Sequence, residues 1–80
     1  MPRFFLNLYD DKDTFDDEGC IFLDADAAKV SAIAGARSII AESVMEGRAI
    51  NLSFRIEISD TSGQVLAVIP FSDTVTFRLS

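Results

Sequence analysis

The densest group of potentially reactive side chains lies between Asp10 and Gly19. Its acidic members are Asp10, Asp11, Asp13, Asp16, Asp17 and Glu18. Carboxylate oxygens are the ligands that Ca²⁺ and Mg²⁺ prefer, but this run lacks the central glycine and the closing glutamate of a calcium-binding loop. Acidic runs of this kind usually form solvated surface segments. We therefore expect a hairpin loop and no metal ion.

The chain offers little else for catalysis. Cys20 is the only cysteine, and the sequence contains no histidine that could activate it as a nucleophile. We expect Cys20 to be a packing residue, and a single cysteine without an intramolecular disulfide fits a reducing, cytoplasmic setting. We therefore expect no enzyme activity, no catalytic residue, no cofactor and no small-molecule ligand.

The net charge limits the kinds of partner that the chain is expected to bind. The 80 residues carry a formal net charge of −6, with only seven Lys and Arg. Phosphate backbones are bound by clustered basic residues, so nucleic acid is not an expected partner. No apolar run approaches the ~20 residues of a membrane-spanning helix, and the N-terminus lacks the pattern of a signal peptide. These patterns favour a cytoplasmic protein that does not bind membranes.

One long helix is predicted between Asp24 and Gly47, and the other elements are expected to pack around it. Asp24 can cap the first turn, and Gly47 supplies the residue that most readily takes the left-handed conformation at a helix end. Gly35 lies within the helix, where close approach to a sheet would explain a glycine. The residues expected on the buried stripe are Ala28, Ala32, Ala36 and Ile39, with Ile40 and Ser43 beside them.

Alternating apolar and polar residues predict the strands. The expected strands are Arg3–Tyr9, Cys20–Leu23, Asn51–Ser59 and Gln64–Phe71. The turn Asp60-Thr61-Ser62-Gly63 joins the last two, and its glycine is expected to have a positive φ. Residues 75–79 also alternate, so a short fifth strand is possible there.

These elements predict a single domain, residues 1–80, of the α+β class. We expect a two-layer arrangement in the order β-β-α-β-β, with one long helix on one face of a four-stranded antiparallel sheet. The other sheet face would then be uncovered. It would carry Phe5 and Tyr9 from the first strand, with either Leu66 and Val68 or Val65 and Ala67 from the fourth. An exposed apolar face on a small domain favours a homodimer or docking of an unidentified protein partner.

Several segments together resemble a known family. They are the opening Met1-Pro2-Arg3-Phe4-Phe5, the loop end Glu18-Gly19, the Asp24 cap before an alanine-rich helix, and the Ile56-Glu57-Ile58-Ser59-Asp60…Gly63…Pro70-Phe71-Ser72-Asp73 segment. The chain is similar to a family of short, uncharacterised bacterial proteins, abundant in alphaproteobacteria and known only as a domain of unknown function. The resemblance implies a bacterial origin and a shared fold, but no activity. Asn7 stands where the family has a histidine and Ser38 where it has an acidic residue, so no role of that histidine carries over.

Three functions are compatible with these patterns. The leading one is a non-enzymatic interaction module that dimerises or docks a partner through its sheet. The acidic strand–loop–strand followed by an alanine-rich helix also resembles antitoxin domains of the HicB type, which implies a small basic toxin as partner, although the DNA-binding segment usual in such antitoxins is missing. Finally, Met1-Pro2 is similar to the start of tautomerases, in which the freed amine of Pro2 would act as a base. That function also needs an arginine-lined apolar pocket, which the sequence does not locate.

Overall fold

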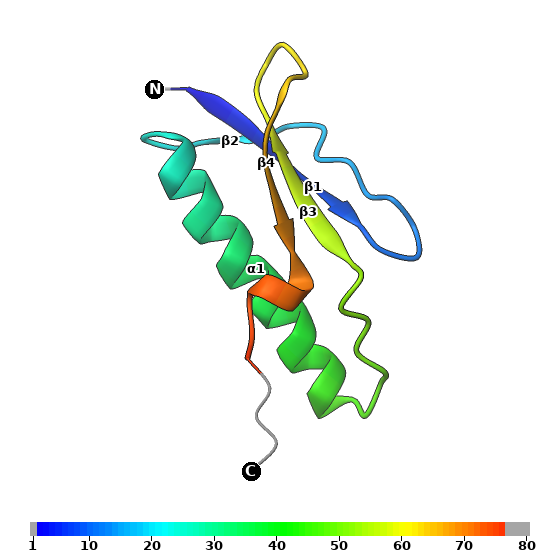
Figure 1. Ribbon diagram of the computed structural model, residues 1–80. Coiled ribbons are helices and arrows are strands. Elements are labelled where there is room, and N and C mark those ends of the chain that lie inside the picture. Colours follow the sequence, from blue (N-terminus) through cyan, green and yellow to red (C-terminus); the bar gives the residue numbers. More distant parts are fainter. Residues whose placement is uncertain (1, 77–80) are drawn as a thin grey trace.

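The structure, a computed structural model, describes residues 2–76. Its elements are β1 (Arg3–Tyr9), β2 (Cys20–Ile21), α1 (Ala25–Met45), β3 (Arg55–Ser59), β4 (Val65–Pro70) and the 3₁₀ helix η1 (Phe71–Asp73). The strands form one antiparallel sheet in the order β2-β1-β3-β4, and α1 packs along one face of it (Figure 1). The predicted α+β fold is confirmed.

Both ends of α1 follow the predicted capping. The Asp24 carboxylate accepts a hydrogen bond of 2.9 Å from the backbone N–H of Ala27. At the other end Gly47 has a φ of 72°. The N–H of Arg48 donates to the carbonyl of Ser43 at 2.8 Å, which is the long-range bond of a Schellman motif. The N–H groups of Gly47 and Arg48 therefore satisfy carbonyls of the last helical turn, and the helix ends there.

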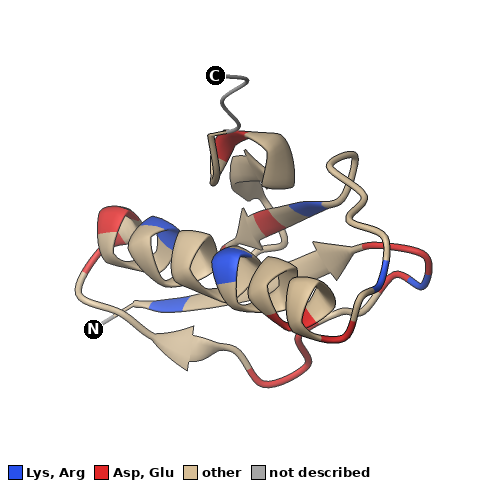
Figure 2. Cartoon of the chain, turned by 90° about the horizontal axis from the view of Figure 1, so that it is seen from below, with Lys and Arg blue, Asp and Glu red and all other residues tan. Residues whose placement is uncertain are grey.

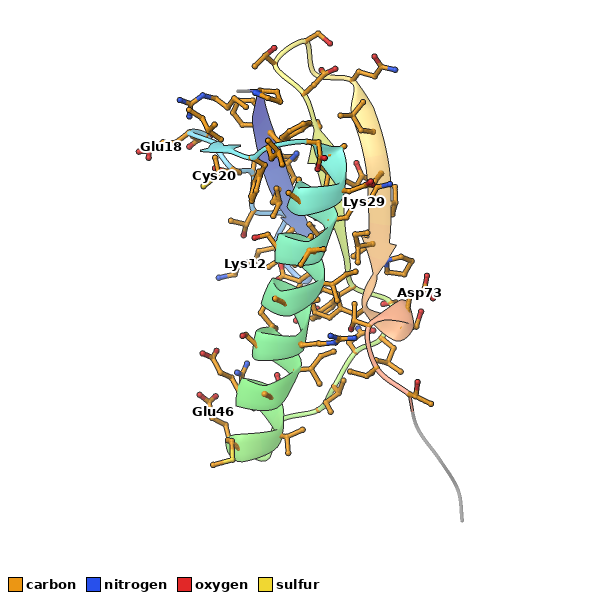
Figure 3. All side chains as sticks on the ribbon, turned by 90° about the vertical axis from the view of Figure 1, so that its left-hand side faces the viewer. Lys12, Glu18, Cys20, Lys29, Glu46 and Asp73 are labelled. Atoms are coloured by element: carbon orange, nitrogen blue, oxygen red, sulfur yellow. The ribbon has the colours of Figure 1, made fainter. Side chains whose placement is uncertain are left out.

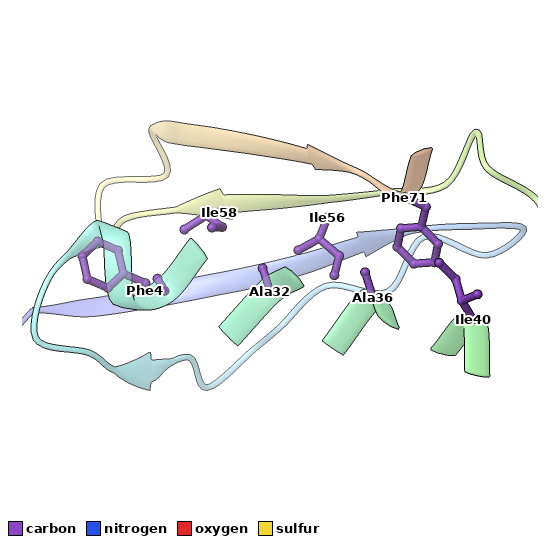
Figure 4. Packing of buried hydrophobic residues seen from close by; sticks show 8 residues of the cluster. Phe4, Ala32, Ala36, Ile40, Ile56, Ile58 and Phe71 are labelled. Carbon is purple, nitrogen blue, oxygen red and sulfur yellow. The ribbon is translucent and has the colours of Figure 1, made fainter. Parts of the chain in front are cut away.

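Small side chains form the buried face of α1. Ala28, Ala32 and Ala36 are completely buried against the sheet (Figure 4). The stripe continues through Ile40, which is buried, whereas the predicted Ile39 is only partly buried. Successive steps of four residues keep Ile40 on the line of the alanines. Gly35 is exposed with open space around it, so close approach to the sheet does not explain this glycine.

Bulky side chains come mainly from the other layer. Ile58 and Phe71 are the largest fully buried residues, and Phe4 and Ile56 complete that side of the core (Figure 4). Phe71 lies in η1, and its ring meets the ring of Phe54 edge-on at 5.8 Å. The layers therefore fit because small helix residues face large residues from the sheet and from η1.

The chain after η1 is tied to the helix. Arg37 donates from Nε to the carbonyl of Thr74 at 2.8 Å, and Thr74 itself is buried. Val75 and Thr76 do not belong to a strand. The rest of the possible fifth strand, residues 77–79, lies outside the described residues.

Strand boundaries are shorter than predicted. Asn51 was expected to begin the third strand, but its side-chain Oδ1 accepts hydrogen bonds from the N–H of Ser53 at 2.9 Å and from the Ser53 hydroxyl at 2.6 Å. This local turn competes successfully with the alternating pattern, so β3 begins at Arg55. Similarly, β2 ends at Ile21 because the chain bends into the helix cap. β4 ends at Pro70, and Phe71 begins η1.

Candidate functional site

The candidate site is the side of the sheet that faces away from α1, here called the open face. Strand register defines it, since the completely buried Ile58 points to the helix and its neighbours point away. Phe5 pairs with Ser59, Asn7 with Glu57 and Tyr9 with Arg55. Glu57 pairs with Val68 on the other side. The open face therefore has an aromatic row on β1, a polar row on β3 and an apolar row on β4.

The apolar row consists of three exposed side chains. Val65, Leu66 and Val68 are 48%, 40% and 47% exposed. Ala67 pairs with Ile58 and therefore faces the helix, which resolves the two predicted alternatives in favour of Leu66 and Val68. Val65 joins them because the register shifts between Ile58 and Ser59, leaving one extra residue on β4.

The β1 row is not uncovered, contrary to the prediction. Phe5 and Tyr9 are only partly exposed. The ring of Phe15, from the acidic loop, packs edge-on against Tyr9 with 5.7 Å between centroids. Gly19 lies directly against Phe5, where an added Cβ would come within 3.0 Å of the ring. The four predicted interface residues therefore do not form one patch, because the acidic loop partly covers Phe5 and Tyr9 and the polar β3 row separates them from Leu66 and Val68.

The polar row is internally satisfied. Arg55 Nε lies 3.0 Å from Glu57 Oε2, and the Arg55 guanidinium carbon lies 4.2 Å above the centroid of the Tyr9 ring. These two contacts hold the guanidinium by an ion pair and by a cation–π interaction. Nearby, Asn7 donates from Nδ2 to the hydroxyl of Ser59 at 3.3 Å. The charges at the centre of the open face therefore cancel locally.

The acidic loop uses its carboxylates to organise the backbone. Asp16 accepts from the N–H of Gly19 at 2.9 Å and from the N–H of Leu6 in β1 at 3.3 Å. Asp10 accepts from the N–H of Lys12 at 2.8 Å. Within residues 2–76, no group of three His, Cys, Asp or Glu side chains is arranged to hold a metal ion. Most acidic residues lie in loops and at helix ends (Figure 2).

The remaining chemically interesting residues lie apart from the open face. Cys20 is exposed on β2, at the sheet edge opposite β4 (Figure 3). Pro2 is exposed, and its carbonyl accepts a hydrogen bond of 3.2 Å from the N–H of Phe22. One small cavity has a volume of about 20 Å³, room for roughly one water molecule. Ile40, Ser43 and other residues near the C-terminal end of α1 line it, so it does not provide a tautomerase pocket at Pro2.

The two edges of the sheet differ. Along β1, the N–H of Leu8 donates to the carbonyl of Thr14 at 2.9 Å, and the Thr14 N–H returns a bond of 2.8 Å. β2 pairs only with Arg3 and Phe4 of β1. The loop bonds to Leu6 and Leu8 satisfy the rest of this edge of β1. The outer edge of β4 has no strand partner among residues 2–76. The exposed apolar row and this unpaired edge therefore belong to the same strand.

Sequence reasoning missed two features of the site. The Arg55–Glu57 pair carried a usable signal, because opposite charges two residues apart on a strand share one face. The placement of Arg55 over Tyr9 carried none, since it depends on the register between β1 and β3. In the part of the chain that the structure describes, no helix has both the length and the apolar character to cross a membrane.

This architecture belongs to the class of small α+β domains. The chain is a member of the family described as Domain of unknown function (DUF6894), whose model matches residues 3–72. Neither the curated proteins nor the solved structures contain a match to it.

Proposed function

We propose that the protein is a non-enzymatic interaction module that binds another protein chain through the β4 side of its sheet. The observation that carries this proposal is the coincidence of a strand edge that no other strand of residues 2–76 pairs with and three exposed apolar side chains, Val65, Leu66 and Val68. Exposed apolar patches on small domains mark interaction sites, and an exposed apolar edge strand is a ready template for another chain.

The polar row next to β4 supports the same function. Arginine and tyrosine are enriched among the residues that dominate binding energy at interfaces. Arg55 is already held by Glu57 and Tyr9, so it would lose little side-chain freedom on binding. The apolar row would contribute the apolar area buried on binding, and Arg55 would fix the orientation of the partner.

The proposed setting is the cytoplasm of a bacterium. Cys20 is exposed and is the only cysteine of the chain, which suits a reducing compartment. The bacterial origin rests on the family resemblance alone. No cofactor, nucleic acid or membrane enters this proposal.

The simplest partner is a second copy of the chain, and sedimentation velocity tests it. The wild type is expected to be a dimer at ~100 µM, a concentration well above the micromolar affinity that a standard-sized interface can reach. Leu66→Glu places a charge in the apolar row and should give a monomer. Val30→Glu is the matched control, because Val30 is equally apolar and 69% exposed but lies on α1. A monomeric wild type, or equal effects of both variants, would contradict dimerisation through β4.

An antitoxin-like role is the second candidate, favoured by the exposed carboxylates of the acidic loop. Asp11, Asp13 and Asp17 point into solvent without a backbone role in the described structure. Acidic surfaces of this kind attract basic partners at long range. A small basic protein encoded beside this chain should then bind it with salt-sensitive affinity, and replacing the three aspartates by asparagine should weaken that binding. Unchanged affinity of the triple variant would count against this role.

A further inference from the structure

The hydrogen-bond pattern of β4 identifies one residue at its free edge. The N–H of Phe71 donates to the carbonyl of Phe54 at 2.8 Å. In an antiparallel pair, hydrogen-bonded and non-hydrogen-bonded residue pairs alternate. Counting back along the register, Ile69 bonds toward β3, whereas Val68, opposite Glu57, does not. The N–H and C=O of Val68 therefore point away from the sheet, toward the free edge.

Both neighbouring positions on this edge are restricted. Pro70 has no N–H to donate, and Leu66 lies in the irregularity that interrupts the register. Bulges and prolines of this kind limit how an edge strand can be extended. Between them, Val68 keeps regular strand geometry and offers both a donor and an acceptor. The edge is therefore open at one defined point rather than along its whole length.

We propose that two copies of the chain join through antiparallel pairing of their β4 edges, with the two-fold axis beside Val68. The Val68 N–H of each copy then donates to the Val68 carbonyl of the other, and the two four-stranded sheets become continuous. This inference rests on the proposed function, since it specifies the partner and the register of the same strand.

Charge distribution favours a second copy despite the net charge of −6. Residues 64–72 contain no charged side chain. Glu57, which lies beside Val68, is neutralised by Arg55 at 3.0 Å. The acidic loop borders β1, which β3 separates from β4, so β1 lies two strand spacings, or about 10 Å, from β4 and farther than that from the seam. That distance is about one Debye length at 0.1 M salt, and the two loops would lie at opposite ends of the joined sheet.

The size of the contact sets the concentration needed for the test. A standard interface buries about 800 Å² per partner, which would be about one-seventh of the 5570 Å² surface of this chain. One strand edge with its flanking side chains is a smaller contact. We therefore expect a reversible dimer with micromolar affinity, studied from ~5 to ~500 µM.

Two substitutions at one position separate backbone pairing from side-chain contact. Val68→Pro removes an N–H that has no partner among residues 2–76 of the monomer, and proline is tolerated at such edge positions. Val68→Thr keeps the N–H and nearly the same shape. Sedimentation velocity is expected to show Val68→Thr associating like the wild type to within about threefold, and Val68→Pro at least tenfold more weakly.

A cross-link tests the register directly. In the Cys20→Ser background, Val68→Cys would place the two sulfur-bearing residues in a hydrogen-bonded pair with Cα atoms about 5.5 Å apart, a distance that suits a disulfide. Mild oxidation is expected to give a covalent dimer. The matched control is Leu66→Cys in the same background, because the two copies of residue 66 would be about 14 Å apart at four residues of offset. It should not cross-link.

The outcomes distinguish this inference from the proposed function. A wild-type dimer that Leu66→Glu disrupts, but that tolerates Val68→Pro and does not cross-link at position 68, would overturn the Val68-centred pairing and leave the interaction surface standing. A wild type that stays monomeric to ~500 µM would overturn both forms of self-association. If Val68→Pro lowers the melting temperature strongly, the cross-linking pair alone decides the register, with dimer at position 68 supporting it and its absence overturning it.

Discussion

Two turns of this protein share one sequence pattern. Asp16 and Asp60 each precede a glycine by three residues, and each carboxylate accepts the N–H of the residue two positions later. The glycines that close the turns, Gly19 and Gly63, have φ values of 71° and 86°. The pattern Asp-x-x-Gly therefore gives an aspartate side-chain bond and a left-handed glycine in both turns. The second turn is also closed by a backbone bond of 3.1 Å from the Gly63 N–H to the Asp60 carbonyl, whereas in the first the Gly19 N–H donates to the Asp16 side chain at 2.9 Å.

The surroundings of the two turns differ. Asp16 also reaches Leu6 in β1, and a Cβ added at Gly19 would lie 2.8 Å from the carbonyl oxygen of Phe4. Gly63 has open space around it. One turn is thus packed onto the sheet and helps to close the β1 edge, whereas the other projects into solvent next to the open β4 edge. Local sequence sets the turn, and tertiary contacts decide whether it also seals an edge.

The largest difference between the two turns is expected in the unfolding free energies of Gly19→Ala and Gly63→Ala. Both substitutions force a left-handed conformation on a residue with a Cβ, at a cost of about 1 kcal/mol. At Gly19 the Cβ also meets backbone, so the loss of unfolding free energy should reach about 2–4 kcal/mol. Urea denaturation of Gly19→Ala and Gly63→Ala measures both. Equal losses would mean that the first turn is no more tightly packed than the second.

Within the acidic loop, Asp16 should matter more than its neighbours. Asp16→Ala leaves the partly buried N–H groups of Gly19 and Leu6 without their acceptor and should cost about 1–3 kcal/mol. Asp13→Ala is the control, because Asp13 is exposed and accepts no hydrogen bond in the described structure; its effect should stay within about 0.5 kcal/mol. Comparable losses at both positions would assign the contribution to the charge of the loop rather than to the Asp16 hydrogen bonds.

The solvent-exposed turn that contains Asp60 should make the stability of the protein depend on pH. The Ser62 hydroxyl, together with the N–H groups of Gln64 and Ser62, holds the pKa of Asp60 below its ordinary value of 3.8, against a smaller opposing effect of desolvation. A lowered folded-state pKa contributes stability that is fully present above the unfolded pKa and is lost as pH falls through the folded one. The melting temperature of Asp60→Asn should therefore depend less on pH below about 4 than that of the wild type. Parallel melting curves for the two proteins would contradict this.

Divalent cations should have the smallest effect. Because Asp16 and Asp10 already accept backbone hydrogen bonds, millimolar Ca²⁺ or Mg²⁺ should leave the melting temperature almost unchanged. A true site would raise it by mass action. A rise of several degrees at low millimolar Ca²⁺ would show that the acidic loop binds a metal ion and would contradict this prediction.

Sequence patterns were sufficient for the layers of the fold and insufficient for its surface. Alternation, the Asp24 cap and the glycines at 47 and 63 depend on neighbours within a few residues, and the elements they predict are present. Asn51 shows the limit of alternation, because its side chain accepts a hydrogen bond from the N–H of Ser53 and the strand begins later than the pattern predicts, at Arg55. The predicted buried stripe of the helix included Ile39, which is only partly buried, whereas Ile40 is buried. Adjacent residues of a helix point about 100° apart, so an error of one residue moves the predicted stripe to a different face.

The candidate site was predictable only in part. Leu66 and Val68 could be assigned to an outward face from alternation, and both are exposed. The cover over Tyr9 could not be predicted, because Phe15 reaches it from a loop whose path depends on contacts with β1. The extra residue at the register shift, which brings Val65 to the same surface, has no signature in the sequence.

The alanine face of α1 has a consequence for the entropy of folding. Ala28, Ala32 and Ala36 have no rotamers to lose on burial, whereas leucine at the same positions would each lose about 0.5–1 kcal/mol of side-chain freedom. Docking the helix therefore orders few torsions on the helix side. The side-chain ordering cost of this interface therefore falls mainly on the facing residues, such as Ile58 and Phe71.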